Sequence, residues 1–340
     1  YINPVESFSP IIIIFLLVLS ILISTVSYYI IEQPFRAKKS FSRKFIFSSS
    51  FVIMFALSVI TIFGIRMEGF QTRFSSEIIA YDKAREPEHI YKPCDNIVNP
   101  DSWCIIGDTK SSNSVLLFGD SHLMSWAPAL NDALKETGQK GYLAMQSNCP
   151  PIINIQLWQT NINCPVKNES VKNFILNNEN INKIIISGYW PAYLKKDAVL
   201  PMRASDISER EDHEIAQLGF TKTIEWMLSL DKTVTMIGPV AVYDESVPLL
   251  LALNELFERN YLQSNYDEQI KKSLNLNKII SNFKNHKNFH YIDALEWLCN
   301  PECKTKNNNL PIYFDSNHLN VSGAKLYKDE FVKIFSENFY

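Results

Sequence analysis

The sequence has no marked excess of charge of either sign. Its 33 lysines and arginines stand against 36 aspartates and glutamates, which gives a formal net charge of −3 at pH 7. A protein that binds nucleic acid over a broad surface usually carries a clear positive excess. The composition therefore indicates no nucleic-acid partner. The chain also lacks internal repeats and long low-complexity stretches, which excludes a repeat architecture.

Charge is missing altogether from two segments, residues 7–31 and 45–65. Each is long enough to cross a hydrocarbon layer of about 30 Å as a helix. Length and hydropathy together favour two transmembrane helices. A buried core helix is the alternative reading of one such run, but two runs close together disfavour it. A signal peptide fits less well, because the runs are long and no small-residue cleavage site is obvious.

Acidic residues are absent between Glu32 and Glu68, and the segment that joins the two apolar runs is basic. Its positive residues are Arg36, Lys38, Lys39, Arg43 and Lys44. A short basic loop stays on the cytoplasmic side of a membrane, so the first helix is expected to run inward and the second to return. The residues after about 66 are then expected outside the cytoplasm.

No C-x-x-C pair occurs, and the cysteine spacings match no common zinc module. No metal site is therefore expected. All six cysteines lie in the part predicted to be exported, and an even number in an oxidising compartment favours disulfides. Sequence proximity predicts three pairs and leaves other connectivities open. The predicted pairs are Cys94–Cys104, Cys149–Cys164 and Cys299–Cys303.

From residue 113 onward, short apolar runs alternate with helical patterns. Strands are predicted at 114–119, 141–146, 183–187, 232–237 and 289–292. Helices are predicted near 122–137, 166–178, 209–230, 247–280 and 322–338. This alternation predicts an α/β fold, a three-layer doubly wound parallel sheet with helices on both faces. Residues 67–112 have no long periodic run and are expected to form a linker.

One motif follows the first predicted strand. In VLLFGDSHLMSW, residues 115–126, the apolar run stops at Gly119 and a helical pattern begins after Asp120. Ser121 thus lies just past the carboxyl end of a strand, where sheets of this kind place their sites. Serine and aspartate are also common helix N-caps. The stretch alone leaves a nucleophile and a capping residue as alternatives.

A nucleophilic serine needs a base, which is usually a histidine oriented by a carboxylate. Among the six histidines, His318 is preferred because Asp315 precedes it by three residues, in a segment that leads into the last predicted helix. An Asp-x-x-His pair can set the carboxylate near Nδ1 and leave Nε2 facing the serine. The alternative is a capping aspartate beside an exposed histidine. His122 adjoins Ser121, but neighbouring side chains at a helix start diverge in direction. His122 is therefore expected to line the cleft and not to act as the base.

The two motifs resemble the first and last sequence blocks of the SGNH hydrolase family, over roughly residues 114–340. The resemblance implies an SGNH-like fold with Ser121 as the nucleophile. It also implies His318 as the general base and then acid, and Asp315 as the partner that orients it.

The middle blocks of that family are less well matched. The family typically completes an oxyanion hole with a glycine after the second strand and an asparagine after the third. This chain has QSNCPP and SGYWP there, so Asn148 and Gly188 are the candidates beside the Ser121 amide. Tyr189 and Trp190 are read either as core residues or as a cleft wall for a sugar ring.

A second resemblance lies in SYYIIEQPFR, residues 27–36. It resembles the end of the acyltransferase family 3 membrane domain, which commonly closes on a Glu-x-Pro-Phe-Arg tag at the cytoplasmic face. With the SGNH-like part, it makes the chain resemble the C-terminal portion of a fused bacterial membrane O-acyltransferase. The resemblance implies an anchor in the bacterial inner membrane, with the residues after about 66 in the periplasm. The expected parts are 1–36, the end of the membrane domain; 37–66, the basic loop and second helix; 67–112, the periplasmic linker; and 113–340, the SGNH-like domain.

This resemblance implies the transfer of an acetyl or other acyl group to a hydroxyl of an exported surface glycan, such as lipopolysaccharide O-antigen. Acetyl-CoA would be the cytoplasmic acyl donor to the membrane domain, most of which would lie before Tyr1, and no cofactor would bind the exported domain directly. The implied partners are the glycan acceptor, the chain's own membrane domain and the membrane. A carbohydrate O-acetyl esterase and a non-catalytic glycan-binding module are the alternatives.

Overall fold

The computed structural model describes residues 9–36, 41–86, 90–153, 156–157, 164–194, 202–203, 212–258 and 260–337. Lys38 and Lys39 of the basic loop lie outside these ranges. The chain divides into two compact units, Tyr1–Ile79 and Ala80–Tyr340. Each unit is described by itself.

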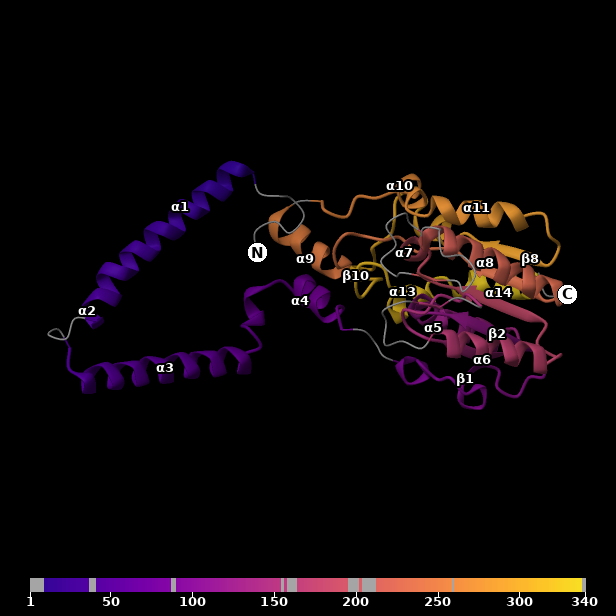
Figure 1. Cartoon of the computed structure of the whole chain (residues 1–340), viewed down its shortest axis with the longest axis horizontal. Coiled ribbons are helices and arrows are strands. Elements are labelled where there is room, and N and C mark those ends of the chain that lie inside the picture. The colour runs from indigo at the N-terminus through magenta and orange to yellow at the C-terminus, as the bar shows by residue number, and fades with distance from the viewer. Residues whose placement is uncertain are drawn as a thin grey trace. The chain divides into compact units, whose positions relative to one another are not determined.

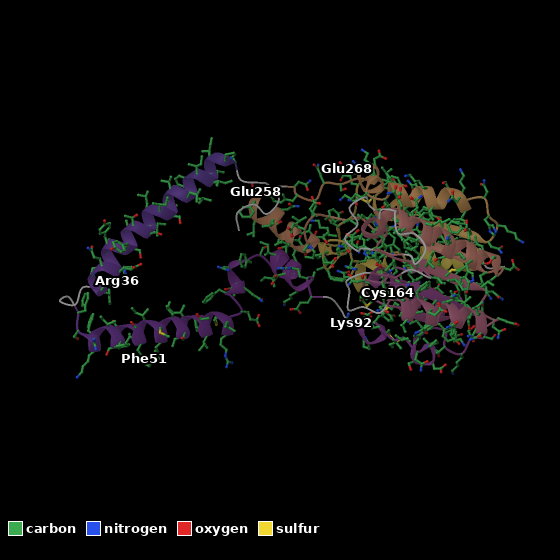
Figure 2. The ribbon with its side chains drawn as sticks, in the orientation of Figure 1. Arg36, Phe51, Lys92, Cys164, Glu258 and Glu268 are labelled. Atoms are coloured by element: carbon green, nitrogen blue, oxygen red, sulfur yellow. A yellow bond between two sulfur atoms is a disulfide. The ribbon has the colours of Figure 1, made fainter. Side chains whose placement is uncertain are left out.

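The first unit consists largely of helices (Figure 1). Its helices are α1, Pro10–Ser27; a π-helical stretch, Tyr28–Glu32; α2, Gln33–Arg36; α3, Arg43–Arg66; and α4, Ser76–Lys83, which runs into the second unit. Pro10–Arg36 and Arg43–Arg66 are each long and apolar enough to cross a membrane, with mean hydropathies of 2.7 and 2.3. Their side chains project outward, as Figure 2 shows around Arg36 and Phe51. These are the two candidate membrane helices that the sequence predicts.

The second unit is built on a six-stranded sheet in the order β1-β3-β2-β5-β7-β8. Its strands are β1, Cys104–Gly107; β2, Ser114–Gly119; β3, Lys140–Met145; β5, Lys183–Ser187; β7, Thr233–Ile237; and β8, Phe289–Ile292. All neighbours pair in parallel except β1 and β3. The order reverses direction after β2, which makes the end of β2 the switch point where such folds bind ligands.

Helices cover both faces of this sheet. The helices are α5, Ser121–Glu136; α6, Cys164–Asn177; α7, Trp190–Leu194; α8, Asp212–Ser229; α9, Val247–Phe257; α10, Tyr266–Lys271; α11, Leu274–Phe283; α12, Ala294–Leu298; α13, Val321–Lys325; and α14, Lys328–Glu337. One core joins the sheet to α5, α9, α12, α13 and α14, and a second joins it to α6, α7, α8 and α11. The fold is therefore the predicted three-layer α/β sandwich.

Strand β2 shows why the sequence gives this architecture. Successive side chains of a strand point to opposite faces. Val115 and Leu117 accordingly enter the first core, while Leu116 and Phe118 enter the second. All four are at most 1% exposed. A strand buried on both faces reads as an unbroken apolar run, which is the pattern that leads up to Gly119.

Two predicted helices differ from the structure. The stretch 247–280 is not one helix but α9, α10 and most of α11. Helix α9 stops at Glu258, whose φ of 52° is left-handed, and α10 starts anew because the Asn265 side chain accepts from Glu268 N–H. The predicted 322–338 helix is present as α13 and α14, which are separated at Leu326. Local capping and turn geometry override the helical periodicity in both places.

The segment 67–112, expected to be a linker or extension, contributes one strand to the sheet near its C-terminal end. Strand β1 pairs antiparallel with β3 at the edge of the sheet, so the sheet is mixed rather than wholly parallel. Short 3₁₀ turns at Lys92–Cys94 and Pro100–Ser102 precede β1. Disulfides join Cys94–Cys104, Cys149–Cys164 and Cys299–Cys303, which are the pairs that the sequence predicts. The first of them ties this segment to the sheet edge.

Side chains from the rest of the domain fix the same segment in place. Both Asp95 oxygens accept hydrogen bonds of 2.8 Å from Ser147, one from its amide and one from its hydroxyl. The Trp103 ring donates to the Ile97 carbonyl at 2.8 Å, and the Lys167 ammonium donates to the same oxygen at 2.6 Å. Lys167 also lies 4.2 Å above the Trp103 ring. Residues 90–107 are thus part of the folded domain.

The buried Lys167 should make the stability of the domain depend on pH. Burial is the main cause that lowers the pKa of Lys167 to about 7, with Asp95 acting in the opposite direction. An unfolded lysine titrates near 10.4. Between about pH 7 and 10 the unfolded chain therefore binds more protons, and the free energy of unfolding rises with pH. Thermal melts at pH 7 and 9.5 should show the wild type gaining Tm relative to Lys167→Met. Parallel pH dependences of the two proteins would contradict this assignment.

Candidate active site

Ser121 is the first residue of α5, at the carboxyl end of β2. The Asp120 carboxylate caps the helix by accepting the His122 N–H at 2.8 Å. Gly119, the last residue of β2, cannot be replaced by a residue with a side chain. A Cβ there would overlap the Ser187 carbonyl oxygen and come within 2.7 Å of Leu123 Cβ. The glycine therefore allows β5 and α5 to pack closely around the turn. Because the Asp120 side chain caps α5, the Ser121 side chain is not needed as a cap.

The structure brings Ser121, His318 and Asp315 together across 197 positions of sequence. His318 Nε2 lies 2.9 Å from Ser121 Oγ. His318 Nδ1 lies 2.7 Å from Asp315 Oδ2. A carboxylate on Nδ1 fixes the proton there, so that Nε2 is left as the acceptor for the serine proton. The arrangement can generate a nucleophilic serine.

The segment around Asp315 holds the carboxylate in this position. Asp315 Oδ1 accepts the amide protons of Asn317 and His318, at 2.9 and 2.7 Å. The Asp315 carbonyl in turn accepts from Val247 N–H, at the start of α9. Burial alone would raise the pKa of Asp315, but hydrogen bonds and charge from His318, with the two amides, lower it overall. The group is therefore an ionised carboxylate at neutral pH.

His318 is confined between two aromatic rings. Phe314 stacks on one side at 5.3 Å between ring centroids, with the planes 8° apart. His122 lies at 4.6 Å from His318 between ring centroids, with the planes 39° apart, and Tyr189 stacks on His122 at 4.6 Å. Burial, and to a smaller degree His318, holds the pKa of His122 well below its usual range. A neutral, buried ring therefore packs against His318 and limits the rotation of its imidazole.

His122, which was expected to line the cleft, and Trp190, for which the sequence left a core role and a cleft wall open, do not line the cavity at Ser121. His122 is only 3% exposed and belongs to the ring stack. Trp190 is completely buried, and its indole N–H donates to the Ile237 carbonyl at 2.7 Å, so it is a core residue. Tyr189 is partly exposed, and its amide donates to Asp120 Oδ2 at 2.9 Å. The sequence alone could not distinguish a core position from a position in the cleft wall here, because aromatic residues are common in both.

Asp120 links the turn between β2 and α5, where Ser121 lies, to the segment after β5. Its Oδ2 accepts from the Tyr189 amide and the Tyr193 hydroxyl, and its Oδ1 from the His122 amide. Burial, the largest influence, raises the pKa of Asp120, and these hydrogen bonds offset part of the effect. Where the SGNH family typically has an asparagine after the third strand, this chain has Gly188 and Tyr189, and the Tyr189 amide donates to Asp120.

The three candidate oxyanion donors lie in different surroundings. The Ser121 amide opens α5 and has no hydrogen-bond partner among the described residues. Gly188 is buried beside Asp120, where a Cβ would come within 3.5 Å of the carboxylate. Asn148 is exposed in a left-handed turn with a φ of 58°. Neither residue lines the cavity at Ser121. The loss of one such donor costs roughly 3 kcal/mol of activation free energy.

A cavity of about 210 Å³ lies beside Ser121 and His318. Sequence reasoning missed the residues that shape it, although Met124 and Pro128 follow Ser121 at helical spacing and Phe314 adjoins Asp315. Tyr91 and Lys92 also line it, so the segment expected to be a linker shapes the cleft. Among the residues that the structure describes, no group of three or more His, Cys, Asp or Glu side chains could hold a metal ion.

The fold and the Ser–His–Asp arrangement define an α/β protein of the SGNH type. The model of the family described as "SGNH domain (fused to AT3 domains)" matches residues 90–333. The chain belongs to this family. The match begins well before residue 113, in agreement with the packing of residues 90–107. Membership of this family supports an enzyme of acyl transfer or ester hydrolysis.

Solved structures with similarity to the chain are remote from it in sequence. The periplasmic domain of a Salmonella ser. Paratyphi A lipopolysaccharide acetyltransferase is 16% identical, covers 68% of this chain and 86% of its own, and has a TM-score of 0.47. A putative acylhydrolase of Bacteroides fragilis is 10% identical, with coverages of 74% and 97% and a TM-score of 0.38. A GDSL-like lipase of Bacteroides thetaiotaomicron is 11% identical, with coverages of 66% and 89% and a TM-score of 0.38. No curated protein sequence matches the chain.

Proposed function

We propose that the chain is the exported part of a membrane O-acyltransferase that acylates a hydroxyl of a bacterial surface glycan, such as lipopolysaccharide O-antigen. The observation that carries the proposal is the unbroken hydrogen-bonded path from Asp315 through His318 to Ser121. This path occurs in a chain whose family is defined by fusion to acyltransferase membrane domains. The two apolar helices before the domain support attachment to the inner membrane, with the domain in the periplasm.

In the first step, Ser121 Oγ attacks the carbonyl carbon of the acyl donor. His318 Nε2, 2.9 Å away, takes the hydroxyl proton as the new bond forms. The Asp315 carboxylate stabilises the imidazolium, which is held between Phe314 and His122. The proton then passes to the departing oxygen or sulfur, the bond to the leaving group breaks, and an ester remains on Ser121.

In the second step, His318 removes the proton of a sugar hydroxyl. The resulting oxygen attacks the acyl carbon, the bond to Ser121 breaks, and the proton returns from His318 to Ser121 Oγ. The Ser121 amide at the start of α5 is placed to stabilise the negative oxygen in both steps. The product is the acylated glycan, and the enzyme is regenerated.

The acyl group would reach Ser121 from the membrane side. Under this proposal acetyl-CoA, or the coenzyme A ester of another acyl group, is the cytoplasmic substrate of the acyltransferase family 3 membrane domain, and that domain passes the acyl group outward. The SGNH domain itself then needs no bound cofactor. The proposed partners of the domain are the glycan acceptor, the membrane domain and the membrane.

Removal of acyl groups by an esterase is the second candidate. The same Ser–His–Asp arrangement activates water as readily as a sugar hydroxyl, and the geometry at His318 favours neither acceptor. A transferase adds acyl groups to the glycan, whereas an esterase removes them.

Mass analysis of surface polysaccharide from cells with and without the intact gene tests the proposal. Deletion of the gene for a transferase should remove the acyl ester from the glycan, and re-expression of the intact chain with its membrane domain should restore it. An increase in acyl content on deletion would identify an esterase instead. An unchanged glycan would overturn both candidates.

A further inference from the structure

The cavity beside Ser121 is apolar on most of its wall. Helix α5 contributes Met124 and Pro128, which follow Ser121 by one and two turns and therefore share its face. The opposite wall comes from the segment that carries His318, through Phe314, Leu319 and Val321. The cavity therefore opens directly at the Ser121 Oγ and His318 Nε2 atoms, and its wall continues away from them along α5.

Two of the polar side chains that line this cavity, those of Asn320 and Lys92, are already engaged, while Ser125 and Tyr91 add single hydroxyl groups to an otherwise apolar wall. The Asn320 amide donates to the Pro311 carbonyl at 2.7 Å, and its oxygen accepts from Gly323 N–H and from Ser322. Lys92 at the rim is paired with Asp95 at 2.8 Å. A sugar ring needs several free hydrogen-bonding partners, whereas an alkyl chain needs only apolar contact. The wall therefore favours an apolar ligand.

The size of the cavity exceeds what an acetyl group needs. A protein cavity of about 150 Å³ lined by aliphatic and aromatic side chains holds the six carbons of benzene. The cavity here measures about 210 Å³. On Ser121, an acetyl ester would place only one methyl group in it. By the same comparison, an alkyl chain of up to about six carbons fits with room to spare.

We propose that this cavity is an acyl pocket that selects acyl groups larger than acetyl, of the butanoyl to hexanoyl class, with Met124 as a specificity-determining residue. The inference rests on the proposed role of Ser121 as the nucleophile and extends it to the identity of the acyl group. The ester carbonyl lies at Ser121 Oγ, and the alkyl chain runs between α5 and Leu319. Tyr91 and Lys92 form the rim and are held in place by the Cys94–Cys104 disulfide.

The test uses p-nitrophenyl esters of two, four and six carbons with the full chain in detergent. Ser121 Oγ gains the acyl group, the bond to the phenol oxygen breaks, and p-nitrophenolate leaves while His318 holds the serine proton. Intact mass measures the acyl adduct, and p-nitrophenolate release measures the rate. Each added methylene that is buried should raise kcat/KM by about fourfold, the equivalent of about 0.8 kcal/mol. The four methylenes that distinguish hexanoyl from acetyl should therefore raise kcat/KM by about 250-fold when all are buried.

Substitution at Met124 separates the pocket from general reactivity. Met124→Trp, which fills the cavity, should lower the hexanoyl-to-acetyl ratio of kcat/KM by at least tenfold. Met124→Ala, which enlarges the cavity, should shift the highest kcat/KM to esters with longer acyl chains. This second variant keeps the test valid if the tryptophan variant does not fold. Leu176→Trp is the matched control, because Leu176 is 48% exposed on α6 and does not line the cavity.

The outcomes distinguish the two proposals. If no ester acylates the wild type above the level of Ser121→Ala, the role of Ser121 fails and the acyl pocket fails with it. If the wild type is acylated but prefers acetyl, or if neither Met124 variant changes the ratio, Ser121 remains the nucleophile and the acyl pocket is overturned.

Discussion

Replacing Ser121 with alanine should lower the rate of acyl transfer by at least about a thousandfold and abolish the covalent acyl adduct. The hydroxyl is the atom that the structure presents to His318 Nε2 at 2.9 Å. Loss of the nucleophile in a serine enzyme removes a whole reaction route, and such losses reach about 10⁶-fold. Initial rates of glycan acylation and intact mass of the chain after exposure to the donor measure the effect.

The same variant should remain folded. Asp120 caps α5, so the helix start does not depend on the serine hydroxyl, and only the bond to His318 is lost, at a cost of about 1 kcal/mol. Ser229→Ala is the matched control, because that serine only bonds the Trp226 carbonyl in its own helix on the surface. An Ser121→Ala protein that melts like the wild type and still acylates glycan at a normal rate would contradict the mechanism.

Replacing Asp315 with asparagine should lower kcat by about 10³–10⁴-fold with little change in the backbone. The asparagine oxygen can still accept the amide protons of Asn317 and His318, as Asp315 Oδ1 does. Its NH₂ group, however, would face His318 Nδ1 as a donor. The imidazole proton then moves to Nε2, and Nε2 can no longer accept the proton of Ser121.

Steady-state rates with the p-nitrophenyl ester, together with a melting curve, measure this variant. Asp329→Asn is the control, because Asp329 is an exposed carboxylate on α14 that pairs only with the neighbouring Lys328. Retention of more than a tenth of the wild-type rate by Asp315→Asn would show that the carboxylate does not set the tautomer of His318.

The side chains of the Ser–His–Asp arrangement were predictable because each lies in a short local pattern. The apolar β2 run, the glycine and the following helix place Ser121 at a strand end by backbone geometry alone. Asp315 and His318 are close in sequence, so one tight turn suffices to join them. Their meeting with Ser121 follows from the doubly wound topology, which gathers the carboxyl ends of the strands at one edge.

The parts that the sequence did not predict depend on contacts between distant segments. Strand β1 has only four residues, and its pairing with β3 leaves no periodic signal. Stacking of His122 on His318 depends on how α5 faces the last loop. The engagement of Tyr91 in the cleft follows from Asp95 and the Cys94–Cys104 bridge. None of these contacts can be read from spacing, because each joins residues whose local patterns are independent.

The Cys94–Cys104 bridge has a mechanical consequence. The polypeptide that arrives from the membrane helices reaches Tyr91 and Lys92 at the cleft before it reaches Cys94. Because Cys94 is bonded to the first residue of β1, the disulfide acts as a clamp. A force applied along the chain before Cys94 therefore has a covalent path through the disulfide to the sheet edge, and this path bypasses residues 95–103.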